Sequence, residues 1–372
     1  MRTYLSSFVT LLGLSVTVNA QNTEGDTTDH QLAVSVYVDA YYAAYSGTVA
    51  EPYAQYITVG GRDNALGLNV AQFSLHYEHE RLRGNFTFHA GDIAGATWSD
   101  VFPNVQEANV GLRLGGDWWL DAGFFRTHIG TESFLPKNNL LSSTAYVTYN
   151  EPFYQSGVRL SYEPAAKWHL EGWLLNGYNS FVDNNRSKSV GMLISYAPNE
   201  STSLTYTNLL GNEAEKDADT QQFRVYQNAY WNQQWGDHFS SILGFDLGLQ
   251  SNSDLEVADE TAVLYAALLT LRYQFDDHWS VTTRGEIFRD ENGFISGTLP
   301  VRGGTRSGAK LTALTLGTEY RPSQYAYLRA EGRYARDPEE LLLFAVDEET
   351  FVDHRWELLL TFGIDLDRTF AF

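Results

Sequence analysis

The sequence has no cysteine, few cations and, after its first twenty residues, no apolar run long enough for a membrane-spanning helix. Without cysteine there is no disulfide framework, no thiolate nucleophile and no cysteine-ligated metal site. Only 25 Lys and Arg stand against 46 Asp and Glu, which gives a formal net charge of −21. Because nucleic-acid binding requires a basic face, this charge balance argues against a nucleic-acid partner.

The first twenty residues have the pattern of an export signal. Arg2 precedes an apolar run from Leu5 to Val18, and Ala20 ends a small-residue cleavage pattern. We therefore predict a secretory signal peptide over residues 1–20 and a mature N-terminal segment over residues 21–31. The alternative is a membrane anchor, but the run is shorter than the roughly 18 residues that a spanning helix needs.

The main pattern in the sequence is an alternation of apolar and polar residues. Residues 311–338 form an alternating segment, a short turn and a second alternating segment, which predicts a β-hairpin. Its second arm places small or apolar residues on one face and charged residues on the other: Leu328, Ala330, Gly332 and Tyr334, against Arg329, Glu331 and Arg333. The same unit recurs from about Leu32 to the end of the chain. The sequence is therefore predicted to be almost entirely β-strand.

The connections between about sixteen strand candidates fall into two classes that alternate. Short turns lie near residues 80–81, 115–117, 163–167, 198–201, 233–237, 276–278 and 321–324. Long polar loops lie near residues 46–65, 91–104, 128–153, 177–187, 211–219, 251–260, 289–308 and 337–354. This asymmetry predicts that residues 32–372 form an all-β domain, a transmembrane antiparallel up-and-down barrel with short periplasmic turns and long extracellular loops. The first strand would pair with the last, because an open edge in lipid leaves backbone groups unpaired.

Aromatic residues lie beside the short turns. They are Trp118, Trp119, Trp168, Trp279 and Tyr325 after turns, and Tyr162, Tyr196, Tyr273 and Tyr320 before them. Trp and Tyr favour the headgroup layer of a membrane, so we expect a ring of aromatics at one height of the barrel. A soluble β-sandwich would explain the number of aromatics but not their position.

Two segments do not fit the alternation. Residues 262–271 are apolar on both faces, so their inner side must be covered by an infolded loop or the strand must lie at a subunit contact. Residues 341–346 (LLLFAV) are apolar inside a predicted loop. That segment extends a strand or plugs the mouth of the barrel.

Several stretches resemble the OmpL-like β-barrel porin family of Gram-negative outer membranes. In order, they are residues 38–45, 123–134, 150–162, 176–179, 284–294, 316–322 and 328–334. The terminal Phe372 is similar to the aromatic signal that such proteins present to the barrel-assembly machinery, although the polar residues Asp367, Arg368 and Thr369 depart from it. The resemblance implies an integral outer-membrane protein, exported through the periplasm, that acts as a porin for passive diffusion of small hydrophilic solutes.

Charged residues on the predicted inner face are candidates to line this pore. They are Asp39, Arg83, Glu107, Arg113, Arg159, Arg224, Arg284, Glu286, Arg329, Glu331 and Arg333. By the same resemblance, the third long loop (residues 128–153) is expected to fold inward as a constriction that carries Glu132, Lys137 and Glu151. Opposed charges across a narrow gap would select solutes by size and dipole.

Other functions have weaker support. The histidines are scattered and no nucleophile motif accompanies them, so we expect no catalytic residues, no metal, no cofactor and no enzyme activity. The acidic residues of the long loops either lie at solvated loop tips or bind divalent cations that bridge to lipopolysaccharide. In the second case the expected partners are outer-membrane lipid and lipopolysaccharide. The sequence leaves open whether the protein is a monomer or a homo-oligomer. The main alternative function is a secreted or surface-exposed β-rich carbohydrate-binding protein that uses its many Trp and Tyr residues.

Overall fold

A computed structural model describes residues 30–46, 52–183, 185, 187–216, 218–300, 306–339, 342–346 and 350–372. The predicted signal peptide (residues 1–20) lies outside the described residues, as does nearly all of the segment 21–31. Within the part of the chain that is described, no helix is long and apolar enough to cross a membrane.

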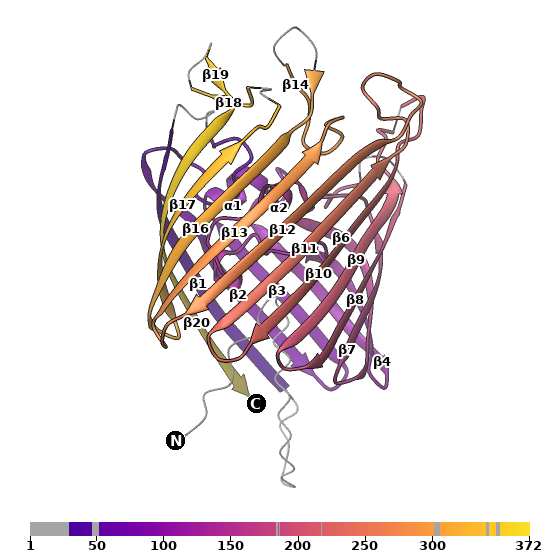
Figure 1. Cartoon of the computed structure of the whole chain (residues 1–372). Coiled ribbons are helices and arrows are strands. Elements are labelled where there is room, and N and C mark those ends of the chain that lie inside the picture. The colour runs from indigo at the N-terminus through magenta and orange to yellow at the C-terminus, as the bar shows by residue number, and fades with distance from the viewer. Residues whose placement is uncertain are drawn as a thin grey trace.

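Sixteen antiparallel strands form one closed barrel (Figure 1). They are β1 (His30–Tyr45), β2 (Ala65–His79), β3 (Leu82–Ala90), β4 (Val105–Gly115), β5 (Trp118–Arg126), β6 (Tyr154–Ala165), β7 (Trp168–Leu175), β8 (Ser189–Asn199), β9 (Thr202–Asn212), β10 (Phe223–Trp235), β11 (Phe239–Gln250), β12 (Ala262–Gln274), β13 (Trp279–Asp290), β16 (Lys310–Ser323), β17 (Ala326–Arg336) and β20 (His354–Ala371). Each strand pairs with its neighbours along the chain, and β1 closes the barrel by pairing with β20. The predicted fold class and the closure of first strand on last are confirmed.

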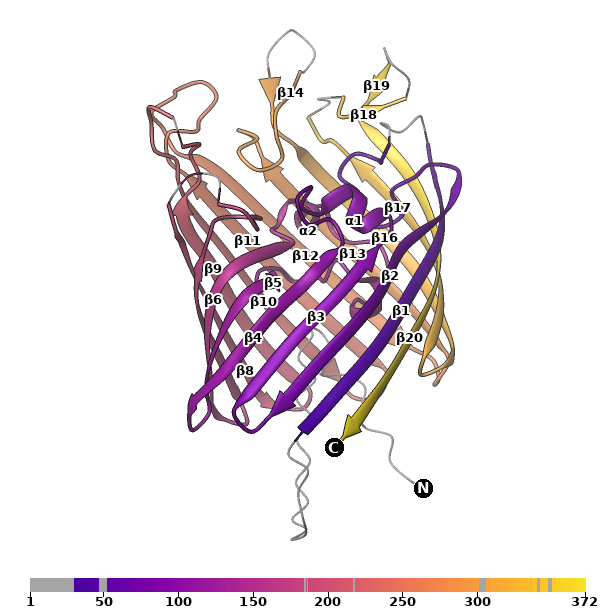
Figure 2. The same cartoon turned by 180° about the vertical axis from the view of Figure 1, so that it is seen from behind.

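The remaining elements lie in the long loops. Two small sheets pair β14 (Leu299–Pro300) with β15 (Arg306–Ser307) and β18 (Phe344–Ala345) with β19 (Phe351–Val352). The helical segments are α1 (Asp92–Thr97), the 3-10 turn η1 (Pro136–Asn138) and α2 (Tyr146–Asn150). Figures 1 and 2 show the short turns and the C-terminus at one end of the barrel and the long loops at the other, as the alternating connections predicted.

The outer face of the barrel is apolar. Along β20, Trp356, Leu358, Leu360, Phe362 and Ile364 are exposed, whereas the residues between them are buried toward the interior. Near the short turns, aromatic rings pair between adjacent strands: Trp118 with Tyr162, Trp168 with Tyr196, and Trp279 with Tyr320, with ring centroids 4.1, 4.3 and 4.8 Å apart. An exposed apolar band bordered by Trp and Tyr is the surface that a membrane-spanning barrel presents to lipid.

The interior explains the two segments that broke the alternation. Leu264, Ala266 and Leu268 of β12 point inward and are buried in the same apolar cluster as Tyr146 and Val147, which come from the third long loop. The expectation that an infolded loop covers this strand is therefore confirmed. Leu343 and Phe344 join the same cluster, and β18 pairs with β19 in a separate sheet rather than extending a barrel strand; Leu341 lies outside the described residues.

Candidate channel interior

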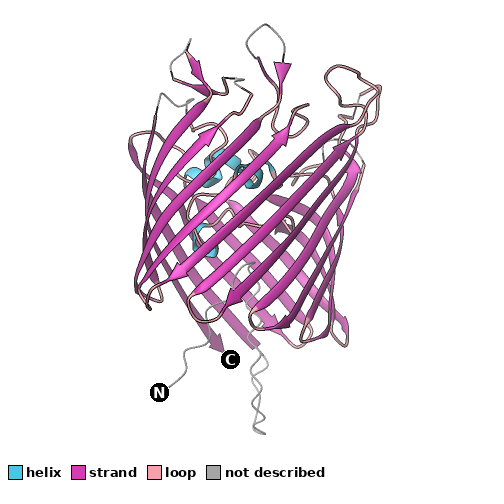
Figure 3. Cartoon of the chain, in the orientation of Figure 1, coloured by secondary structure: helices cyan, strands magenta, loops and turns pink. Residues whose placement is uncertain are grey.

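The third long loop, L3 (residues 127–153), joins β5 to β6 and lies inside the barrel. Its helix α2 is drawn within the ring of strands in Figure 2, and the helical segments coloured cyan in Figure 3 lie inside the same ring. Ile129, Leu135 and Tyr146 are each at most 2% exposed. A surface loop would leave such side chains in water, so burial of apolar area accounts for the inward fold of L3.

Two glycines lie at the base of L3, where β5 and β6 pair. Gly123 and Gly157 are register partners and have φ values of 138° and 156°. A Cβ atom on Gly157 would lie 2.0 Å from the carbonyl oxygen of Leu174, and one on Gly123 would lie 2.3 Å from that of Ala108. Only glycine permits this backbone shape and this close approach, so both positions shape the wall directly below the loop.

Three arginines of the wall donate hydrogen bonds to the backbone of L3. Arg284 Nη1 donates to the carbonyl oxygen of Ser143 at 2.7 Å. Arg329 donates to the carbonyl oxygens of Pro136 and Asn139 at 2.8 and 2.9 Å, and Arg333 donates to that of Thr144 at 2.9 Å. L3 has little secondary structure, and buried backbone carbonyls need partners. The guanidinium groups supply those partners.

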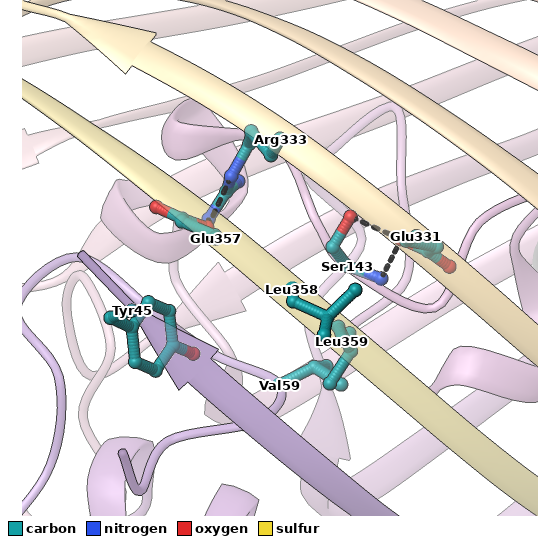
Figure 4. Close-up of a pocket in the computed structure, with 8 residues that line it drawn as sticks. All are labelled: Tyr45, Val59, Ser143, Glu331, Arg333, Glu357, Leu358 and Leu359. Atoms are coloured by element: carbon teal, nitrogen blue, oxygen red, sulfur yellow. Dashed lines mark hydrogen bonds and ion pairs between the residues drawn. The ribbon is translucent and has the colours of Figure 1, made fainter. Parts of the chain in front are cut away.

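Acidic side chains accept hydrogen bonds from the backbone N–H groups of the same segment. Glu331 accepts from Ser143 N at 3.1 Å and from Ser143 Oγ at 2.6 Å (Figure 4). It also accepts from Ser142 N. Glu286 accepts from Tyr146 N at 2.6 Å. The loop is thus held by alternating donors and acceptors on β13 and β17.

These contacts bring together five of the predicted pore-lining residues. Arg284, Glu286, Arg329, Glu331 and Arg333 all lie on the inner face, each at most 5% exposed. Their charges are engaged by L3 and by one another, for example Arg284 with Glu286 at 3.4 Å. Contact of these five groups with a solute remains a prediction.

A second group of predicted residues lies on the wall from β3 to β6. Arg83 and Arg159 both bind Asp121, with Arg83 Nε at 2.7 Å and Arg159 Nε at 3.2 Å from its carboxylate oxygens. Glu107 pairs with Arg126 at 2.9 Å. Arg113 is exposed near the short-turn end. The structure therefore separates these residues from the group that holds L3.

Asp39 borders the group that holds L3, because the ring of its partner Tyr327 lies 4.2 Å from the guanidinium carbon of Arg329, whereas Arg224 lies apart from both groups. Asp39 is buried and accepts hydrogen bonds from Asn69 Nδ2 at 2.6 Å and Tyr327 at 2.5 Å. Arg224 donates to Gln250 at 2.8 Å and to the carbonyl oxygen of Phe294, which belongs to a long loop, at 3.3 Å. Arg224 is thus placed close to the long-loop end of the barrel.

The three predicted constriction residues all contact the wall. Glu132 pairs with Arg284 at 2.9 Å. Lys137 Nζ lies 2.9 Å from Asp365, and burial lowers the pKa of Lys137 while the charge of Asp365 opposes that shift. Glu151 is buried against Asp246 of β11. Burial and the negative charge of Asp246 raise the pKa of Glu151 well above its usual range.

The raised pKa of Glu151 predicts a pH-dependent stability. The contribution of protonated Glu151 to the free energy of unfolding is fully present below the ordinary pKa of a glutamic acid, about 4.5, and is lost as the pH rises through the raised pKa. The temperature of heat unfolding, followed by gel mobility between about pH 5 and about pH 9, should therefore fall with rising pH more steeply than in Glu151→Gln. The exposed-loop variant Glu215→Gln should behave like the unmodified protein. Parallel curves for unmodified protein and Glu151→Gln would contradict this prediction.

Several interior residues were missed by sequence reasoning. Asp121 binds two arginines, and Glu357 pairs with Arg333 and, at 2.8 Å, with Arg355. Alternation could have placed them, because each is flanked by outward apolar residues: Leu120 and Ala122 in the first case, and Trp356 and Leu358 in the second. The backbone atoms of L3 that bind the wall side chains have no such signal.

Comparisons with known proteins agree with this geometry. A family model described as "Putative beta-barrel porin-2, OmpL-like" matches residues 31–363, which confirms the resemblance seen in the sequence motifs. No curated protein shows significant similarity to the chain.

Solved structures share the fold at low sequence identity. The anion-selective porin from Comamonas acidovorans is 10% identical over 91% of this chain and 100% of its own, with a TM-score of 0.62. The outer membrane channel DcaP of Acinetobacter baumannii is 13% identical over 90% and 97%, with a TM-score of 0.58. OmpT of Vibrio cholerae, in its trimer form, is 11% identical over 91% and 99%, with a TM-score of 0.53.

Proposed function

Since the chain belongs to the OmpL-like family of β-barrel porins, we propose that it is an outer-membrane porin through which small hydrophilic solutes diffuse passively, and not an enzyme. The observation that carries this proposal is a closed barrel with an apolar outer face and an interior of charged, hydrogen-bonded side chains. A charged interior suits contact with water and polar solutes.

L3 is proposed as the constriction. It occupies the interior beside β12, β13 and β17, and its Glu132, Lys137 and Glu151 each contact the wall. Any water path through the barrel must therefore run beside the loop, because the loop fills part of the cross-section. The arginine and glutamate pairs around the path would set its field, because opposed charges in a narrow gap orient a dipolar solute.

Reconstitution tests the proposed function. The purified protein is added to planar bilayers, where stepwise conductance is expected, and to liposomes, where swelling rates should fall as the test sugars become larger. A protein that folds stably in buffer without detergent and produces no conductance would favour the carbohydrate-binding alternative. Heat-modifiable migration on a detergent gel is a control for the folded barrel.

Localisation and assembly belong to the same proposal. The exposed Phe372 follows β20, and its backbone N–H donates to the carbonyl oxygen of His30 at 3.0 Å, so the terminal aromatic ring lies at the closing seam. We expect the barrel-assembly machinery to bind this end and lipopolysaccharide to contact the long loops through divalent cations. Removal of Phe372 should lower the yield of outer-membrane protein in cell fractions; an unchanged yield would contradict this role.

A polar cluster on the outer face supports self-association. Asn208 and Gln227 are cross-strand partners on β9 and β10 and point outward, because their neighbours point inward. Tyr206 Oη donates to Gln227 Oε1 at 3.0 Å and lies 3.3 Å from Asn208 Nδ2. Amide groups among lipid-facing Leu and Met are costly unless they find partners. A second copy of the chain could supply those partners.

Loss of these amides is expected to weaken the homo-oligomer. The double variant Asn208→Leu/Gln227→Leu should move detergent-extracted protein toward the mass of one copy in light scattering, without loss of heat-modifiable migration. The matched double variant Leu204→Ala/Leu247→Ala, on the same outer surface, tests whether removal of bulk alone has this effect. A single-copy mass for the unmodified protein would contradict the proposed self-association.

A further inference from the structure

One carboxylate of the inner wall serves three arginines near the short-turn end. Glu319 of β16 accepts from Arg272 Nη2 at 2.7 Å, from Arg321 Nε at 2.9 Å and from Arg329 Nε at 2.7 Å. Arg329 is also close to Glu331, but the printed ion pairs of Arg272 and Arg321 among the described residues are with Glu319 alone, so these two cations and one carboxylate give a local excess of 2 − 1 = 1 positive charge. This excess contrasts with the net charge of −21 for the whole chain.

Unpartnered hydrogen-bond donors lie in the same place. Arg272 Nε and Ser280 Oγ are buried and have no hydrogen-bond partner among the described residues. Ser280 is the register partner of Glu319, and Arg272 projects from the adjacent strand β12. A buried donor without a partner is unfavourable, and a buried guanidinium in excess of its carboxylates is more so. The cluster therefore has both charge and donors to offer an anion.

The three arginines are not equivalent. Arg329 is fully engaged, because it also binds the carbonyl oxygens of Pro136 and Asn139 in L3. Arg272 is 9% exposed and keeps its Nε free of partners within the described part of the chain. The side chain of Arg321 is 32% exposed and lies close to the short-turn end of β16. Arg321 is thus the member that an ion arriving from that end would meet first.

We propose that Arg272, Arg321 and Ser280 form a binding site for a small oxyanion, a phosphate or carboxylate group, that enters from the short-turn end of the barrel. The proposal rests on the proposed function in that the barrel interior must be open to solutes at this end. A guanidinium group presents paired N–H donors that match the oxygens of phosphate and carboxylate, and the serine hydroxyl adds a further donor. Glu319 holds the arginines in place without neutralising them.

Calorimetric titration of the full-length protein in detergent tests the site directly. Inorganic phosphate is the first probe and acetate, at equal ionic strength, is the second. We expect Arg321→Gln and Arg272→Gln each to weaken binding of the anion at least about tenfold, as loss of one charge-assisted contact would. Arg289→Gln, which removes one positive charge at the opposite end of β13, should bind as the unmodified protein does.

The outcomes separate this inference from the porin proposal. Binding of either probe that is lost in Arg321→Gln supports the site, even if planar bilayers show no conductance and the porin proposal fails. Conductance in bilayers with no binding of either probe, or with binding that Arg321→Gln leaves unchanged, overturns the site and leaves the porin proposal intact. Arg321 is partly exposed, so Arg321→Gln remains informative if the more buried Arg272→Gln fails to fold.

Discussion

Deletion of residues 138–143 from L3 is expected to raise the single-channel conductance about two- to fivefold, because the narrowest part of a water-filled path dominates its resistance. This segment places Leu141 and Ser142 in the interior, where each is at most 2% exposed. It also contains the backbone N–H groups of Ser142 and Ser143, which donate hydrogen bonds to Glu331. Without it, Arg329 and Glu331 would face water.

A deletion of equal length in an exposed loop is the matched control. Residues 254–259 lie between β11 and β12 and are mostly exposed. Their removal should leave conductance close to that of the unmodified protein, which separates loss of L3 from a general effect of loop shortening. Equal conductance for the 138–143 deletion and the unmodified protein would rule out L3 as the constriction.

Replacement of Arg284 by Leu is expected to detach part of L3 and to destabilise the protein by roughly 3–5 kcal/mol, as removal of one partner of a buried ion pair does. Arg284 has no exposed surface, and it is bound to Glu132 and Glu286 as well as to the backbone of Ser143. Glu132 would remain buried without its cation, and Glu286 would keep the more distant Arg333, at 3.9 Å. The readouts are the temperature of heat-modifiable migration and the rate at which protease cuts L3.

A compensating variant distinguishes lost pairing from lost packing. Glu132→Gln in the Arg284→Leu background removes the carboxylate charge that has lost its partner, so it should recover part of the lost stability. Arg289→Leu, on the outward face of the same strand, should have a small effect because, among the described residues, its guanidinium binds backbone carbonyl oxygens and Thr312 and no carboxylate. If Arg284→Leu and Arg289→Leu unfold at the same temperature, Arg284 does not anchor the loop.

The fold could be predicted because the geometry of a barrel in lipid imposes a regular pattern on the sequence. Each strand exposes one face to hydrocarbon and the other to the interior, so the period of two is preserved, as Val36 and Val38 against Tyr37 and Asp39 show. The apolar inner face of β12 broke that period, and this departure correctly indicated a covering loop.

The arrangement of charges in the interior could not be predicted in the same way. Alternation placed Arg284, Arg329 and Glu331 on the inner wall, but their partners are backbone atoms of L3, and a backbone carbonyl at Pro136 or Ser143 has no sequence signature. The contact between Glu151 and Asp246 joins residues on different elements that no local pattern relates. Which charges meet is decided by how far the loop descends into the barrel.

The seam between β1 and β20 has a consequence for the time course of folding. Gln31 pairs with Ala371 and Tyr45 pairs with Glu357, so the contacts with the largest sequence separation in the barrel are the ones that close it. Contacts between distant residues form slowly, since the chain must lose much freedom before they stabilise it. Until the last strand arrives, the hydrogen-bonding edge of β1 is available to other strands. We infer that closure of this seam limits the rate of folding.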